Sequence, residues 1–296
     1  MRLSGLHILL TYRCTFECDH CFAWGSPRQT GVFKGEQIGR VLEQAREAGL
    51  QWIYFEGGEP FLYYALLVDA VKQASDMGFS VGIVTNAYWA ISIADAKRAL
   101  EPFAGRVGDL TVSSDQFHYG IVPGEEPQNA ITAAKSLNIP TCVISIAQPA
   151  AEAIQSRGQV SDGAAVMFRG RAAQALAPAL ATRPWESLTE CPHENLRDPG
   201  RVHLDPLGNL HVCQGVIIGN LFDRPLKEIC DSYDAAAHPI CGPLLEGGPA
   251  ALVSEYGLAH EAQYADGCHL CYQARVALRT RLSQILAPDQ MYGVET

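Results

Sequence analysis

The segment LHILLTYRCTFECDHC (residues 6–21) joins an apolar, strand-like run to three closely spaced cysteines. Cys14, Cys18 and Cys21 form a C-x3-C-x2-C pattern, which gathers three thiols in one short loop. Structural zinc sites and ordinary electron-carrying [4Fe–4S] clusters each use four protein ligands. Three cysteines therefore leave one coordination position open, and at such a position a metal site can meet a substrate or cofactor.

Strand-like apolar runs alternate with helix-like segments over roughly the first 180 residues. The expected strands cover residues 6–11, 52–56, 80–85, 109–113, 141–147 and 164–168. The expected helices cover residues 35–48, 64–77, 93–100, 128–137 and 150–157. Repeated βα units favour parallel strands joined by right-handed crossovers. The pattern predicts an α/β fold, either an incomplete barrel or an open, doubly wound sheet.

The polar loops of this region follow the expected strands. The cysteine loop follows the first strand, Gly57-Gly58-Glu59-Pro60 the second, Thr85-Asn86 the third and Ser114-Asp115 the fourth. In both candidate folds, ligands bind at the carboxyl ends of the parallel strands. We therefore expect these loops to converge on one site.

The second part of the chain has a different character. Pro178, Pro184 and Pro192 interrupt the alternation. A hairpin is expected over residues 201–213, a short helix over 225–233, and a helical segment from His269 to Leu286. The change predicts two regions, residues 1–180 and residues 181–296.

Composition excludes several classes of protein. The 296 residues carry a formal net charge of −10, which argues against a nucleic-acid or anionic-membrane partner. Neither a signal peptide nor an apolar run of about 18 residues is present. We expect a cytoplasmic protein, in which ten cysteines are unsuited to a disulfide framework. Apart from Cys142, expected in a strand core, they fall into two groups, which predicts two metal centres.

The cysteine pattern followed by Gly57-Gly58-Glu59-Pro60 resembles the radical S-adenosylmethionine (radical SAM) superfamily. The resemblance covers roughly residues 1–180 and implies a partial (β/α)6 barrel. It also implies a [4Fe–4S] cluster held by the three cysteines, whose fourth position binds S-adenosylmethionine. An alternative is a zinc knuckle with His20 as the fourth ligand, although His20 and Cys21 are adjacent.

The resemblance assigns roles to neighbouring residues. Glu59 and the Gly57-Gly58 backbone are expected to hold the amino group of S-adenosylmethionine, and the His20 backbone its adenine. One electron, from a reductase such as flavodoxin or ferredoxin, would cleave the sulfonium and leave a 5′-deoxyadenosyl radical that abstracts hydrogen from the substrate.

Further candidates for cofactor contacts lie near the ends of the expected strands. They are Pro60, Asn86, Ser113, Asp115, His118, Tyr119 and Arg169. Some of them have a local alternative: Asp115 would also cap a loop, and Arg169 would also stand at a solvated helix start.

The second cysteine group resembles the auxiliary-cluster regions of the SPASM and twitch subfamilies. Cys191, Cys213, Cys268 and Cys271 would close the coordination of one auxiliary [4Fe–4S] cluster in residues 181–296, which suits electron transfer. Cys230 or Cys241 could replace a ligand, although a buried apolar thiol is the commoner fate of an isolated cysteine. A structural zinc site is the alternative for the group.

Together these features predict a radical SAM enzyme that oxidises its substrate through an auxiliary cluster. The expected strand at residue 6 leaves no peptide-recognition region before it, which favours a small molecule. A peptide substrate stays open, because a separate protein can supply recognition. Two other classes stay open as well: a non-catalytic iron–sulfur electron carrier and a zinc-stabilised interaction protein.

Overall fold

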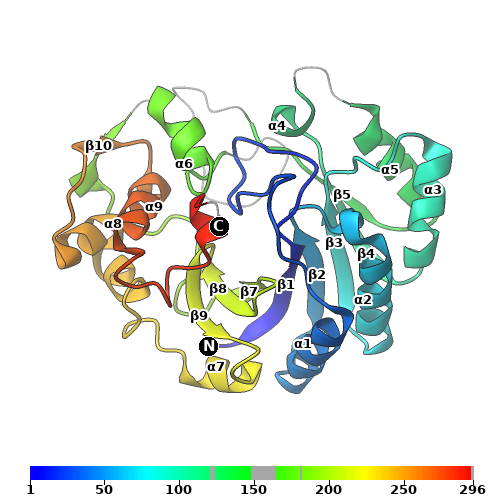
Figure 1. The fold of residues 1–296 in the computed structure, drawn as a ribbon, viewed down its shortest axis with the longest axis horizontal. Helices are drawn as coiled ribbons and strands as arrows, with labels where there is room; N and C mark the ends of the chain where they lie inside the picture. The colour runs from blue at the N-terminus through cyan, green and yellow to red at the C-terminus, as the bar shows by residue number, and fades with distance from the viewer. Residues whose placement is uncertain (121–123, 148–164, 181, 295–296) are drawn as a thin grey trace.

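The computed structural model describes residues 1–120, 124–147, 165–180 and 182–294. Its main feature is an eight-stranded sheet with the strand order β5-β4-β3-β2-β1-β7-β8-β9 (Figure 1). The strands are β1 (Leu3–Thr11), β2 (Trp52–Gly57), β3 (Ser80–Thr85), β4 (Val107–Ser113), β5 (Thr141–Ile144), β7 (Gly200–Leu204), β8 (Asn209–Cys213) and β9 (Val216–Asn220). From β5 to β7 all neighbours are parallel, and β7, β8 and β9 form an antiparallel meander.

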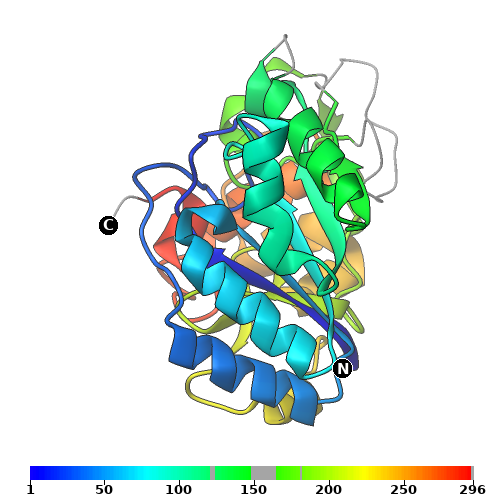
Figure 2. The ribbon, with the colours of Figure 1, turned by 90° about the vertical axis from the view of Figure 1, so that its right-hand side faces the viewer.

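The helices of the first region cover the outer face of the parallel strands (Figures 1 and 2). They are α1 (Gly35–Glu47), α2 (Tyr64–Asp76), α3 (Ile93–Leu100) and α5 (Glu125–Ser136), with the short η1 (Pro60–Tyr63) and η2 (Glu101–Phe103). The short α4 (Gln116–Tyr119) follows β4 and lies beside the cysteine loop. Alternation along β1 sends Leu6, Ile8 and Leu10 into this core and leaves His7 on the opposite face. The predicted α/β fold with an open sheet of parallel strands is confirmed.

The last expected strand and the last expected helix of the first region have no counterpart among the described residues. No strand forms over residues 165–168, the described part of the expected sixth strand. Val166 and Phe168 instead bury their side chains in a small apolar cluster with Ala172. The helix expected over residues 150–157 lies outside the described residues.

One helix begins earlier than its apolar period indicates. α5 starts at Glu125 rather than at residue 128. Two acidic residues favour the amino end of a helix, and Pro127 in the first turn costs no hydrogen bond. The charged first turn therefore lies outside the apolar pattern on which the prediction rested.

Most of the second region packs in another apolar core, to which Leu9, Tyr12 and Ala23 of the first region also belong. Beyond the meander, its elements are β6 (Arg183–Pro184), η4 (Trp185–Ser187), α7 (Leu226–Ser232), α8 (Cys241–Tyr256), β10 (Gln263–Tyr264), α9 (Gly267–Leu278) and η5 (Asp289–Tyr292). Two short elements precede it, α6 (Ala172–Ala175) and η3 (Ala177–Ala179), and α7 packs in the first core. Helix α8 is kinked at Gly247 and Gly248, and this interruption concealed the helix in the sequence. Because β7 pairs with β1, one sheet crosses the boundary predicted at residue 180. The division into two regions stays a prediction.

None of the helices in the described ranges combines the length and the apolarity that a membrane span requires.

Candidate active site and candidate metal centre

The three cysteines of the first loop line a cavity of about 1080 Å³ at the carboxyl ends of the parallel strands. The loop returns to its own start, because the Cys14 N–H donates to the Ser26 carbonyl at 3.0 Å. Backbone N–H groups also reach two sulfurs: Phe16 donates to Cys14 Sγ at 3.4 Å and Gly25 to Cys21 Sγ at 3.2 Å. Such N–H···S bonds are typical of the surroundings of iron–sulfur clusters.

The electrostatics of this loop fit a cationic occupant. Burial raises the pKa of Cys14 to about 12, and the charges of Glu59 and Cys21 add to the effect. Burial and the two neighbouring thiols also raise the pKa of Cys18. Three thiolates in this space would repel one another unless metal ions neutralised them. The residues therefore fit a cluster with three cysteine ligands.

Gly57 and Gly58 let the loop after β2 pack directly against the segment that leads to Cys14. The Gly58 N–H donates to the Thr11 carbonyl at 2.7 Å, and the Glu59 N–H to the Arg13 carbonyl at 2.9 Å. A Cβ on Gly58 would lie 2.1 Å from the Arg13 carbonyl oxygen, which no side chain allows. The glycine pair thus has a packing role, and both residues line the cavity.

Glu59 is fully buried, and its carboxylate bonds within the protein. Oε1 accepts from the Phe61 N–H at 3.0 Å and from Thr85 Oγ1 at 2.8 Å, while Oε2 accepts from the Asn86 N–H at 2.8 Å. Burial raises the pKa of this carboxyl to about 7, against the effect of these hydrogen bonds. Glu59 therefore ties the loop after β2 to the end of β3, and its contact with an amino group stays a prediction.

Asn86 connects this arrangement to the cysteine loop. Its Nδ2 donates to Thr15 Oγ1 at 3.1 Å and lies 3.6 Å from Cys14 Sγ. Its carbonyl accepts a hydrogen bond from the Tyr119 hydroxyl. The structure thus brings Cys14, Glu59 and Asn86 together, as the convergence of the loops predicts. Pro60 is buried at the start of η1.

His20, Asp115 and His118 form one group beside the cysteine loop. Asp115 caps α4 by accepting from the N–H groups of Phe117 and His118, and its other oxygen accepts from the Ile146 N–H. His118 Nδ1 lies 2.7 Å from Asp115 Oδ1. The His20 ring packs on Phe117, and burial lowers the pKa of His20 to about 4. Asp115 therefore has the local capping role, while Ser113 and His20 line the cavity.

The segment Arg169-Gly170-Arg171 joins the two cysteine groups. Arg171 donates to the carbonyls of Cys18 at 2.7 Å and Gly25 at 2.9 Å. Gly170 packs on the loop with φ +61°, and a Cβ there would lie 2.6 Å from the Cys21 carbonyl oxygen. Arg169 is 5% exposed and donates from Nη1 to Glu194 Oε1 at 2.8 Å and to Cys213 Sγ at 3.1 Å. The alternative of a solvated helix start is wrong for Arg169, which is buried.

A second, much smaller cavity of about 20 Å³ collects the cysteines of the second region. All four predicted ligands line it: Cys191, Cys213, Cys268 and Cys271. They come from the loop after η4, the end of β8 and the first turn of α9. Burial raises the pKa of Cys271 to about 12, although the Arg275 guanidinium opposes the shift. Buried thiols that face two guanidiniums, Arg169 and Arg275, fit an anionic metal–thiolate centre.

The remaining cysteines differ in their surroundings. Cys241 is fully buried at the start of α8 and lines the second cavity as a fifth thiol. Cys230 is buried in α7 within the first core, apart from both cavities. The expectation that Cys142 belongs to the strand core is wrong: its thiol is exposed on the inner face of β5 and lines the large cavity.

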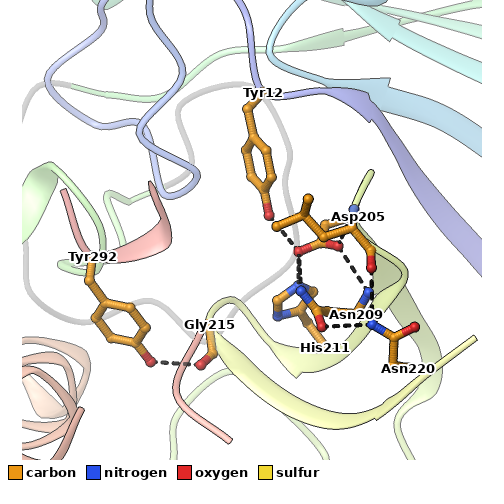
Figure 3. A network of polar contacts seen from close by, with 8 residues as sticks. Tyr12, Asp205, Asn209, His211, Gly215, Asn220 and Tyr292 are labelled. Atoms are coloured by element: carbon orange, nitrogen blue, oxygen red, sulfur yellow. Dashed lines mark hydrogen bonds and ion pairs between the residues drawn. The ribbon is translucent and has the colours of Figure 1, made fainter. Parts of the chain in front are cut away.

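A buried polar network forms a second connection between the two regions (Figure 3). The Tyr12 hydroxyl, two residues before Cys14, donates to Asp205 Oδ2 at 2.8 Å. The same oxygen lies 3.1 Å from His211 Nε2 and accepts from Asn209 Nδ2 at 3.0 Å. Asp205 and His211 are fully buried. The cysteine loop is thereby anchored to the hairpin that ends at Cys213.

Sequence reasoning missed the inner face of the sheet. The large cavity is lined there by polar and aromatic side chains, namely His7, Trp52, Tyr54, Glu56, Asp109, Thr111, Arg201 and His203. A barrel interior is ordinarily packed with branched apolar residues. The available signal was the single polar residue within an apolar run, as in Leu6-His7-Ile8.

Comparison with known proteins agrees with this geometry. The family model described as the radical SAM superfamily matches residues 8–147. This segment contains the three cysteines and the Gly-Gly-Glu-Pro loop. Residues 8–147 form a radical SAM superfamily domain.

The radical SAM domain also carries the similarity to curated proteins. The chain is 31% identical over 129 residues to YydG of Bacillus subtilis (strain 168), a protein provisionally named for peptide biosynthesis. It is 37% identical over 87 residues to the PqqA peptide cyclase of Streptomyces rochei. The alignments cover 42% and 28% of this chain. The chain spans 40% and 23% of the length of these relatives.

Two solved structures share the fold at low sequence identity. BtrN in complex with AdoMet and 2-DOIA aligns with a TM-score of 0.52 at 14% identity, over 77% of this chain and 82% of BtrN. Streptococcus suis SuiB bound to S-adenosylmethionine aligns with a TM-score of 0.53 at 15% identity, over 79% of this chain and 66% of SuiB. At these identities the likeness concerns the fold alone.

Proposed function

We propose that this protein is a radical SAM enzyme that acts on a substrate bound inside its large cavity. One observation carries the proposal: Cys14, Cys18 and Cys21 line the cavity together with the Gly57-Gly58 backbone, within a radical SAM domain. A [4Fe–4S] cluster and S-adenosylmethionine would supply reductive sulfonium cleavage and a 5′-deoxyadenosyl radical. The chain's own residues hold the ligands and keep water from the reacting centre.

The residues around the cysteines have distinct parts in this proposal. Cys14, Cys18 and Cys21 would ligate the cluster. The Gly57-Gly58 backbone and Asn86 lie beside them and would contact the methionine part of the cofactor, with Glu59 as the candidate partner of its amino group. Ser113 and His20 also line the cavity and would contact its nucleoside part.

We propose further that the second cavity holds an auxiliary [4Fe–4S] cluster for electron transfer. Its four predicted ligands are Cys191, Cys213, Cys268 and Cys271, which line one enclosed space. Arg169 lines both cavities and donates to Cys213 Sγ, so it would neutralise part of the negative charge of the centre. A closed cluster beside the substrate cavity suits net oxidation, in which the substrate passes on an electron.

Two substrate classes are retained, each with its own support. The polar inner face of the sheet favours oxidation of a small polar molecule enclosed in the cavity. A peptide is supported by the names of YydG and the PqqA peptide cyclase. At about 1080 Å³ the cavity also exceeds slightly the usual range of small-molecule pockets, and it would admit a peptide side chain. An external reductase such as flavodoxin or ferredoxin would supply the electron.

The test is anaerobic reconstitution with iron and sulfide, followed by an assay for 5′-deoxyadenosine. We expect about eight irons per chain, since two [4Fe–4S] clusters are proposed, and 5′-deoxyadenosine upon reduction with dithionite. Iron without S-adenosylmethionine cleavage would instead identify an electron carrier. A colourless protein that contains zinc would identify a zinc-stabilised interaction protein.

A further inference from the structure

Three side chains on neighbouring strands meet on the inner face of the sheet, and none of them is a cysteine. His7 lies on β1, Glu56 on β2 and His203 on β7, and these strands are adjacent in the order β2-β1-β7. His7 is in register with His203 on one side and with Tyr54 on the other. Glu56 is two residues beyond Tyr54 and therefore on the same face. Strand pairing alone thus places two imidazoles and one carboxylate together.

The three groups are close enough to share one ion. His7 Nδ1 lies 2.9 Å from Glu56 Oε2, and His203 Nε2 lies 3.3 Å from Glu56 Oε1. One ligand atom from each residue falls within 4.8 Å of the other two. All three side chains line the large cavity, and each is 10–16% exposed. An ion at this point would be held by the protein on one side and would face the cavity on the other.

The hydrogen bonding of this group is incomplete. His203 is 8% exposed, and within the described ranges of the chain its ring atom Nδ1 has no hydrogen-bond partner. Its 3.3 Å contact with Glu56 Oε1 lies outside hydrogen-bond geometry, because that oxygen also has no hydrogen-bond partner there. Burying such groups without partners costs free energy, which a bound ligand would recover.

Neighbouring aromatic rings hold the group in place. The His7 ring stacks on Tyr54 with a centroid distance of 5.0 Å and meets Trp52 edge to face at 5.4 Å. The Tyr54 hydroxyl in turn donates to Asp109 Oδ2 at 2.9 Å. Orientation of this kind is what a metal-binding imidazole requires from its surroundings.

We propose that His7, Glu56 and His203 bind a divalent first-row transition metal ion, with Zn²⁺ as its representative. Two imidazoles and one carboxylate are a common ligand set for Zn²⁺ and for non-haem Fe²⁺. Three protein ligands leave coordination positions open toward the cavity. There the ion would polarise a carbonyl or hydroxyl oxygen of the bound substrate. The site uses no cysteine ligand and does not depend on cleavage of S-adenosylmethionine.

The charges around the site allow such an ion. Two guanidiniums, those of Arg169 and Arg201, also line the cavity. The charge of Arg169 is compensated by Glu194 at 2.8 Å, and Arg201 is exposed. Asp109 on β4 adds a negative charge on the same face. Glu56 would compensate one charge of the ion directly.

The other histidine group of the cavity is less suited to an ion. In the group of His20, Asp115 and His118, both carboxylate oxygens already accept hydrogen bonds, from His118 and from backbone N–H groups. Glu56 differs because one of its oxygens is unpartnered. His118→Gln is therefore the matched control for the experiment below.

The test uses full-length protein whose clusters are first reconstituted anaerobically, so that the cysteines are occupied. The protein is then equilibrated with Zn²⁺ and desalted, and its zinc is counted by mass spectrometry. We expect about one zinc per chain in the wild type and in His118→Gln. His203→Asn and Glu56→Gln should weaken zinc binding by at least about 100-fold, since even outer-sphere changes cost up to that factor.

Zinc K-edge X-ray absorption identifies the ligands. Nitrogen and oxygen scatterers without sulfur support the site. Sulfur scatterers, loss of zinc in His118→Gln, or no zinc retained by the wild type would overturn it. Unchanged iron content and circular dichroism in His203→Asn and Glu56→Gln show that these variants are folded.

Discussion

The two cysteine-lined cavities differ in the room that they leave. The first has three cysteines grouped at one edge of about 1080 Å³, with Cys142 apart from them on β5, and the second has five cysteines around about 20 Å³. Three ligands beside a large space suit a centre that binds another molecule. Four or more ligands around a closed space suit a centre that exchanges electrons only. The number of thiols and the free volume thus favour the same assignment: the first centre binds another molecule, and the second transfers electrons.

The walls of the cavities explain this difference. The large cavity lies against the inner face of the sheet, whose side chains are polar and aromatic and leave space for a substrate. The small one lies within the second apolar core, between the meander and helices α8 and α9. Arg169 belongs to both walls, so the two centres are neighbours.

Removal of one thiol from the first cavity should have the largest effect. Cys18→Ala leaves two ligands for the first cluster, so 5′-deoxyadenosine formation should fall to background. Iron content should fall by about four per chain, because the second cluster keeps all its ligands. Iron analysis and chromatography of the products measure both. Substantial 5′-deoxyadenosine from this variant would disprove the assignment of the first site.

Removal of a thiol from the second cavity should affect iron without stopping S-adenosylmethionine cleavage. Cys268→Ala should lose about four irons per chain, since three ligands hold a buried cluster poorly. The control is Cys241→Ala, which removes the fifth thiol of the same cavity and should leave iron unchanged. If Cys241→Ala loses iron and Cys268→Ala does not, the proposed ligand set is wrong.

Loss of the Arg169 side chain, which lines both cavities, should destabilise the fold. Arg169→Gln leaves the Glu194 carboxylate buried without its cation, a change that costs about 3–5 kcal/mol of unfolding free energy. The matched control is Arg106→Gln, which breaks the 2.6 Å ion pair with Asp76 at the surface and should cost about 0–1 kcal/mol. Urea unfolding of the iron-free protein compares the two variants. Equal effects would show that Arg169 does not stabilise the boundary between the cavities.

Glu59 should give the smallest effect, as a pH dependence of stability. Its folded pKa of about 7 lies above the ordinary value of 4.5, because the carboxyl is buried. The folded state therefore holds a proton that the unfolded state releases. The protonated Glu59 side chain therefore contributes to the free energy of unfolding. This contribution, up to about 3 kcal/mol, is complete below about pH 4.5 and is lost as the pH rises through 7. In the iron-free protein, Glu59→Gln should flatten unfolding free energy against pH over this window. Parallel curves for the two proteins would contradict the raised pKa.

Local patterns in the sequence were sufficient for most elements of the first region. The apolar runs of β1 to β4 and the helix period of α1 to α3 predicted these elements to within a few residues. The C-x3-C-x2-C loop and the Gly-Gly-Glu-Pro loop identified the family before any contact was known. Such features depend on neighbours in the chain, so a short window of sequence contains them.

Other parts of the site depend on residues far apart in the chain. No local signal shows that β7 pairs with β1, about 200 residues away, yet this pairing brings His203 to His7. Nor does any signal show that Arg169 reaches Cys213, that Cys241 joins the second cavity, or that Glu59 turns into the protein. Each outcome depends on how whole elements pack, and packing minimises free energy over the entire fold.

The sequence by itself therefore determined the chemistry available to this protein: two groups of thiols, a glycine-rich loop and alternating strands that present their ends on one side. Only the tertiary structure decided which groups share a space. It opened a large cavity at three cysteines and closed a small one around the others. The physical reason is that composition and spacing select ligands, whereas long-range strand pairing and core packing set the distances between them.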